Sequence, residues 1–166
     1  TYRLDTAFAY ADEHVAKDRE DATPQIAALL AGMPEGAGYT VVLGVDEALV
    51  AGLARYTEQQ VVVVSSDAGK IRALRESTGA MYGARVTALQ EDLGKVPLGS
   101  EFANAVVVVV DDRKTQSEAR RIVRPEGGRI LSPLGKVLHV AGRVSKAGDW
   151  THQYGSGANT ASSDDG

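Results

Sequence analysis

The stretch Thr40-Val-Val-Leu-Gly-Val-Asp-Glu-Ala-Leu-Val-Ala-Gly-Leu-Ala54, followed by Val61-Val-Val-Val-Ser-Ser-Asp67, decides the fold of this chain. Two short β-branched runs are separated by room for one amphipathic helix, which is typical of a β-α-β unit and hence of a parallel sheet. Gly44 stands where the first strand must turn sharply into that helix, a position that favours a residue without a β-carbon. Nucleotide-like cofactors usually bind at this turn, so the sequence predicts a candidate site near Gly44.

The same alternation of apolar runs and helical segments continues along the chain. It predicts strands over 40–43, 61–64, 85–89, 105–110 and 128–131, helices over 47–56, 68–76 and 115–123, and a weaker strand over 137–140. The second and fourth strands are apolar throughout, as expected when helices cover both faces of a parallel sheet. Right-handed crossovers then favour an α/β fold with a doubly wound, mostly parallel, Rossmann-like sheet.

The chain is expected to divide into three segments, which are a central domain and one further segment at each end. Residues 1–38 are predicted to form a helical amino-terminal extension, in which Ala7 to Val15 show helical spacing and Pro24 begins a second helix. Residues 39–146 are expected to form the Rossmann-like domain. Residues 147–166 are rich in Gly, Ser, Asn and Asp and are expected to be a carboxy-terminal tail or linker.

Composition excludes several classes of function. The 166 residues suit one domain, and the net charge of −4 gives no reason to expect a nucleic-acid partner. No stretch approaches the roughly 18 consecutive apolar residues that span a bilayer, so no membrane span is expected. The absence of cysteine excludes disulfides and thiolate chemistry, and the three histidines lack metal-site spacing, so no metal is predicted.

Over residues 38–131 the chain resembles the class I S-adenosylmethionine-dependent methyltransferases. The residues that carry the resemblance are Val41-Val-Leu-Gly44, Val61-Val-Val-Val-Ser-Ser-Asp67, Gln90-Glu-Asp92, Asn104-Ala-Val-Val-Val-Val-Val-Asp111 and Ile122-Val-Arg-Pro-Glu-Gly-Gly-Arg-Ile130. The last stretch is similar to the segment that leads into the fifth strand of these enzymes. The resemblance implies S-adenosylmethionine as the cofactor.

The resemblance also implies a set of cofactor-binding residues. Gly44 would approach the methionine part of the cofactor, Asp92 would bind the adenine amino group, and Glu91 and Leu93 would flank the adenine. The complete set is Gly44, Val45, Asp46, Ser65, Ser66, Asp67, Glu91, Asp92, Leu93 and Asp111. No catalytic residue and no methyl acceptor is assigned, because methyl transfer from a sulfonium needs mainly positioning.

The chain departs from the family at several of these positions. The later glycines of the first turn fall on Asp46 and Ala48, and the acid that holds the ribose falls on Ser65. Asp67 either replaces that acid or caps the following helix, and Asp111 either faces the substrate or lies in a solvated loop. Loss of the bidentate acceptor for the ribose hydroxyls should weaken cofactor binding by about 1–3 kcal/mol, or about tenfold or more in affinity. Weakened cofactor binding is therefore expected.

The tail provides a second resemblance. Trp150, Tyr154, Gly155, Ala158, Asn159, Thr160 and Ser162 resemble the opening of β-propellers of the pyrroloquinoline-quinone (PQQ) type. The junction is similar to one in large bacterial proteins where a methyltransferase-like domain adjoins such a propeller, which implies a covalently linked propeller partner. The alternative is a flexible linker whose aromatic residues pack on the domain.

Two functional hypotheses follow. One is an S-adenosylmethionine-binding methyltransferase-like domain of weakened or lost activity, which would be cytoplasmic if active. The other is a non-catalytic structural or interaction module attached to a PQQ-like propeller, which would lie in the cell envelope or periplasm.

Overall fold

The computed structural model describes residues 19–143 of the chain. The predicted amino-terminal helix around Ala7 to Val15, and the tail from residue 147, lie outside the described residues. Within residues 19–143, none of the helices has both the length and the apolar character needed to span a membrane.

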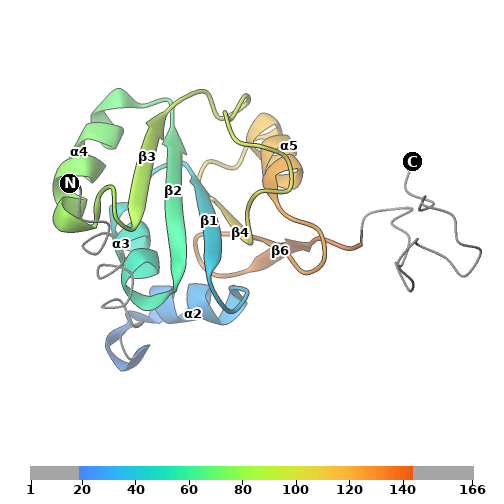
Figure 1. Ribbon diagram of the computed structural model, residues 1–166, viewed down its shortest axis with the longest axis horizontal. Helices are drawn as coiled ribbons and strands as arrows, with labels where there is room; N and C mark the ends of the chain where they lie inside the picture. The colour runs from blue at the N-terminus through green and yellow to red at the C-terminus, as the bar shows by residue number, and fades with distance from the viewer. Residues whose placement is uncertain (1–18, 144–166) are drawn as a thin grey trace, which may run out of the picture.

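One six-stranded sheet forms the centre of the structure (Figure 1). Its strands are β1 (Gly38–Leu43), β2 (Gln59–Ser65), β3 (Val86–Gln90), β4 (Ala105–Val108), β5 (Arg129–Leu131) and β6 (Val137–Val140). They lie in the order β3-β2-β1-β4-β5-β6, with β1 to β5 parallel and β6 antiparallel to β5. The predicted α/β fold with a mostly parallel sheet is confirmed, and so is the weaker strand at 137–140.

Helices cover both faces of this sheet. They are α2 (Pro24–Gly32), α3 (Glu47–Tyr56), α4 (Ala68–Thr78) and α5 (Arg113–Ile122), with short 3-10 turns at Arg19–Asp21 and Gly79–Met81. Leu29 of α2 shares one hydrophobic layer with buried side chains of α3 and α4, and the buried side chains of α5 belong to the layer on the opposite face. Ile26 and Leu30 of α2 form a separate small cluster with Tyr56 of α3. In Figure 1, α4 and α5 accordingly stand on opposite sides of the sheet.

The strands are buried on both faces because consecutive valines alternate between the two layers. Val42 packs with Leu49, Leu53 and the other side chains of α3, whereas Val41 packs with Ile122 and the α5 side. This arrangement explains why β1, β2 and β4 read as continuous apolar runs rather than alternating ones.

The fourth strand is shorter than the predicted span of 105–110. It ends at Val108, because the N–H groups of Val109 and Val110 both donate to the carbonyl of Leu43, at 2.9 and 3.1 Å. The chain therefore folds over the end of β1 instead of continuing the strand. The next helix begins at Arg113, before the predicted Thr115, because Asp112 caps it.

Helix α2 packs against the sheet rather than standing apart from it. Leu29 is fully buried in the same layer as α3. Ile26 lies so close to Gly52 of α3 that a β-carbon on Gly52 would be 2.6 Å from Cδ1 of Ile26. Pro24 at the helix start and Thr23 as its cap fix where this helix begins.

Candidate active site

The residues predicted to bind a cofactor follow four neighbouring parallel strands. Gly44, Val45 and Asp46 follow β1, and Ser65 ends β2 with Ser66 and Asp67 after it; Glu91, Asp92 and Leu93 follow β3, and Asp111 follows β4. Because the carboxyl ends of parallel strands meet at one edge, the sheet places all four segments along the same edge.

Gly44 has a structural reason to be glycine. Its φ is +110°, and a β-carbon at this position would lie 2.8 Å from Cβ of Val109 and 3.0 Å from Cγ2 of Val110. Its N–H donates to the carbonyl of Val64 at 2.8 Å, which ties the turn to β2. The close approach of the segment after β4 is sufficient to account for this glycine.

Two of the predicted acidic residues cap helices. Oδ1 of Asp46 accepts a hydrogen bond from the N–H of Leu49 at 3.0 Å, and Oδ1 of Asp67 accepts one from the N–H of Lys70 at 3.0 Å. Each carboxylate thus satisfies an amide in the first turn of its own helix. Val45, between Gly44 and Asp46, is half-buried against the α3 layer.

Ser65 ends β2, at the position where the resemblance implies the contact to the ribose. Its side chain is buried, and its hydroxyl accepts a hydrogen bond from the N–H of Asp67 at 3.2 Å. Its carbonyl accepts a hydrogen bond from the N–H of Glu91 at 3.0 Å, which joins the segments that follow β2 and β3. Ser66, the next residue, is exposed.

A depression of about 350 Å³ lies between these two segments. It is lined by Ser66, Gln90, Glu91 and Asp92. The structure thus brings together three of the predicted site residues. It adds Gln90, which is part of the Gln90-Glu-Asp92 stretch that carries the resemblance but is absent from the predicted cofactor-binding set.

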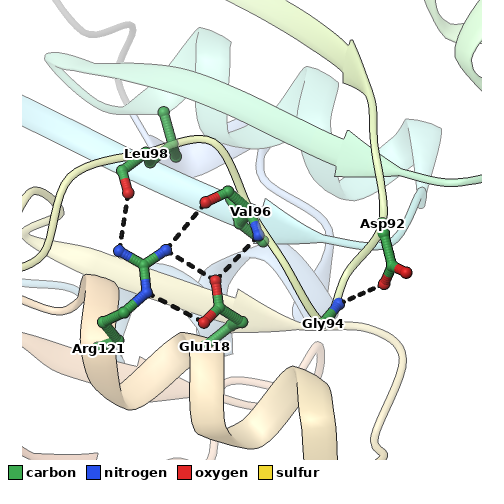
Figure 2. A network of polar contacts seen from close by, with 6 residues as sticks. All are labelled: Asp92, Gly94, Val96, Leu98, Glu118 and Arg121. Carbon is green, nitrogen blue, oxygen red and sulfur yellow. Dashed lines mark hydrogen bonds and ion pairs between the residues drawn. The ribbon is translucent and has the colours of Figure 1, made fainter.

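Asp92, which lines this depression, holds a tight turn through its hydrogen bond with Gly94 (Figure 2). Its Oδ1 accepts a hydrogen bond from the N–H of Gly94 at 2.6 Å, and its carbonyl accepts one from the N–H of Lys95 at 3.1 Å. The side chain itself is exposed. Leu93 is half-buried and packs against the α5 layer, which anchors the turn.

Asp111 and Asp112 begin the segment that leads into α5. Oδ1 of Asp111 accepts a hydrogen bond from Nε2 of Gln116 at 2.8 Å. Asp112 caps the helix, and the N–H of Thr115, at 2.9 Å from Oδ1, is the main cause that lowers the pKa of this carboxyl. The N–H of Lys114 donates to the same oxygen at 2.8 Å.

Beyond Asp92 along the chain, the connection from β3 to β4 is hydrogen-bonded to an ion pair on α5 (Figure 2). Arg121 and Glu118 form two parallel hydrogen bonds, Nε to Oε1 at 3.0 Å and Nη2 to Oε2 at 2.7 Å. The hydrogen bonds from Arg121 lower the pKa of Glu118, and the same pairing raises the pKa of Arg121. Sequence reasoning missed this pair, although its spacing of three residues on a predicted helix is a usual one for ion pairs.

Carboxylates are frequent along this edge, but none of them builds a metal centre. Across residues 19–143, no cluster of three or more His, Asp or Glu side chains has the arrangement needed to hold a metal ion. The residues gathered around the depression are hydrogen-bonding groups suited to an organic ligand, with carboxylates that favour a cationic one.

Comparison with solved structures identifies the fold. The chain is similar to an S-adenosylmethionine-dependent methyltransferase of Methanococcus maripaludis, with a TM-score of 0.58 and 18% identity over 80% of this chain and 64% of that one. It is also similar to a predicted O-methyltransferase of Agrobacterium tumefaciens, with a TM-score of 0.53 and 21% identity over 64% of this chain and 59% of that one. The chain has the Rossmann-like α/β fold of these methyltransferases.

A third similar structure contains a cofactor product. It is the geranyl diphosphate C-methyltransferase of Streptomyces coelicolor in complex with S-adenosylhomocysteine, with a TM-score of 0.56 and 17% identity over 65% of this chain and 42% of that one. The chain spans less than two thirds of the length of each of these three structures. No protein-family model and no curated protein matches the sequence.

Proposed function

We propose that residues 38–131 bind S-adenosylmethionine at the carboxyl edge of the sheet, as a methyltransferase-like domain with lowered cofactor affinity. The observation that carries the proposal is the depression of about 350 Å³ lined by Ser66, Gln90, Glu91 and Asp92 in a methyltransferase fold. The adenine would lie there, with its amino group on the carboxylate of Asp92. The ribose would lie toward Ser65 and Asp67, and the methionine part toward the turn at Gly44.

The charge of the edge supports this ligand. Glu91, Asp92 and Asp67 are exposed carboxylates on adjacent segments, and the sulfonium of S-adenosylmethionine is a cation. Attraction between exposed charges is weak, about 1 kcal/mol at 4 Å in water, and is screened by salt. In the proposed placement the sulfonium lies toward Gly44, on the far side of the ribose from Glu91 and Asp92. We therefore expect only a small preference for S-adenosylmethionine over S-adenosylhomocysteine, which lacks the positive sulfur, and we expect this preference to shrink as salt is added.

The hydrogen bonds at the ribose position support the lowered affinity. The hydroxyl of Ser65 is occupied by the N–H of Asp67, and the carboxylate of Asp67 is occupied by the N–H of Lys70. With Oδ1 of Asp67 directed at the Lys70 amide, the carboxylate can offer a ribose diol Oδ2 but not two free oxygens for bidentate acceptance. The net cost of an unmade hydrogen bond of this kind is about 1–3 kcal/mol.

Calorimetric titration of the full chain with S-adenosylmethionine and S-adenosylhomocysteine tests the proposal. We expect binding, and we expect Asp92→Ala to weaken it by at least about tenfold, the effect of losing a hydrogen bond to a charged group. The matched control is Asp21→Ala, because Asp21 is an exposed aspartate before α2 with no role at this edge. Absence of heat with millimolar ligand, or equal loss in both variants, would refute the proposal.

The second candidate function is a non-catalytic module attached to a propeller of the PQQ type. The observation that favours it is that Asp46 and Asp67 are used as helix caps, which a domain without a cofactor also needs. The residues that suggested the propeller, from Trp150 onward, lie outside the described residues. Failure of both ligands to bind would favour this candidate, and sequencing into the region after Gly166 would test the linkage.

A further inference from the structure

The connection from β3 to β4 crosses the sheet without a helix. Residues 91–104 contain no helix or strand, although crossovers between parallel strands usually carry a helix that satisfies its own backbone. This connection nevertheless covers the α5 face, with Val96 only 4% exposed and Leu93 and Leu98 packed against the same layer. Within the connection, the N–H groups of Lys95 and Leu98 donate to the carbonyls of Asp92 and Val96, and its remaining buried backbone groups must find partners outside it.

One face of α5 supplies those partners (Figure 2). Arg121 donates from Nη1 to the carbonyl of Leu98 at 2.8 Å and from Nη2 to the carbonyl of Val96 at 2.9 Å. Oε2 of Glu118 accepts a hydrogen bond from the N–H of Val96 at 2.9 Å. The bidentate pairing between Arg121 and Glu118 keeps both side chains aimed at the connection.

The same helical face reaches the turn that holds Asp92. Lys114 precedes Glu118 by four residues, so the two side chains lie on one side of α5. A β-carbon on Gly94 would lie 3.2 Å from Cδ of Lys114 and 3.2 Å from Oδ1 of Asp92. Gly94 therefore lies next to the side chain of Lys114 in the first turn of α5. The carboxylate of Asp92 accepts a hydrogen bond from the amide of the same glycine.

We propose that Glu118 and Arg121 are positioning residues for Asp92. They hold Val96 and Leu98 on α5, and this restrains the preceding Gly94, whose amide orients the Asp92 carboxylate at the rim of the depression. The consequence for ligand affinity rests on the proposed function, because it requires that Asp92 binds the adenine amino group. The holding of the turn itself does not depend on any ligand.

The test compares Arg121→Gln and Glu118→Gln with Arg120→Gln in the full 166-residue chain. Arg120 is the matched control, because it is exposed on the same helix, carries the same charge and, within the described residues, makes no hydrogen bond to residues 94–98. The first readout is amide hydrogen exchange measured by NMR at Gly94 and Val96, with the amide of Val63 in β2 as the internal check of the fold. The second readout is the affinity for S-adenosylhomocysteine by calorimetry.

We expect Arg121→Gln to speed exchange at Gly94 and Val96 by about tenfold, the effect of losing a hydrogen bond to a charged group. Val63 should stay protected, and the affinity should fall by a similar factor. Glu118→Gln should speed exchange at Val96, because one uncharged oxygen must then serve both the Arg121 guanidinium and the Val96 N–H, which two charged oxygens serve in the unaltered chain. This second variant decides the question if Arg121→Gln does not fold.

Two results would overturn the inference. One is exchange at Gly94 and Val96 that is the same in the Arg121 and Glu118 variants as in Arg120→Gln. The other is a turn that opens while the affinity stays equal to that of Arg120→Gln. If the unaltered chain binds neither cofactor nor product, the proposed function fails, but the exchange rates still decide whether α5 holds the Asp92 turn.

Discussion

Replacing Gly44 with alanine measures how strongly the fold itself requires this glycine. A side chain at φ +110° carries backbone strain of about 1–3 kcal/mol. The added methyl would lie 2.8 Å from Cβ of Val109, a β-branched residue on a packed segment, and overpacking of this kind costs about 1–3 kcal/mol. The free energy of unfolding should therefore fall by about 4 kcal/mol, a large share of the total for a single domain.

A matched variant separates these two contributions. Gly127 has φ +95°, and a β-carbon there would have no heavy atom within 4 Å, so Gly127→Ala carries the strain without the contact. Urea unfolding followed by circular dichroism should show Gly44→Ala to be less stable than Gly127→Ala by about 1–3 kcal/mol, with equal slopes. Equal stabilities would refute the argument that the segment after β4 excludes a side chain at Gly44.

Three further predictions concern single contacts. Asp46→Ala should lower the free energy of unfolding by about 1 kcal/mol because it removes the acceptor for the N–H of Leu49, as chemical denaturation can measure. Thr40→Val should lower the free energy of unfolding by about 1–3 kcal/mol because it leaves the buried side-chain oxygen of Gln59 unpaired. Adding Gln59→Leu should recover part of that loss in the same assay. The pKa of Glu118 is held below its ordinary 4.5 by Arg121, so the folded chain binds fewer protons there than the unfolded chain. The stabilisation is complete above pH 4.5 and is lost as pH falls through the lowered value, so Glu118→Gln should flatten the dependence of Tm on pH in that acidic range.

The sheet and its helices could be predicted because their signals are local. The runs at 61–64 and 105–108 are apolar on both faces, and Pro24 and the acids before α3 and α4 mark helix starts. The hydrogen bonds that hold residues 91–104 against α5 could not be predicted from such local signals. Arg121 bonds to the carbonyls of Val96 and Leu98, which lie far from it in sequence and in a segment without periodicity. Such contacts depend on how the chain folds back, which no short window of sequence contains.

The acidic residues at the carboxyl edge of the sheet show why the candidate site was harder to predict than the fold of the chain. An aspartate between a parallel strand and a helix has the right chemistry both to cap the helix and to bind a ligand, and Asp46, Asp67 and Asp112 all cap helices. Asp92 differs because no helix follows β3, so its carboxylate has no first turn to cap. Within residues 19–143 the Asp92 carboxylate accepts one hydrogen bond, through Oδ1 from the N–H of Gly94, and Oδ2 faces solvent or a ligand. In a sheet of this kind, an acid after a strand that lacks a following helix is therefore the more informative candidate, and here that acid lies at the depression.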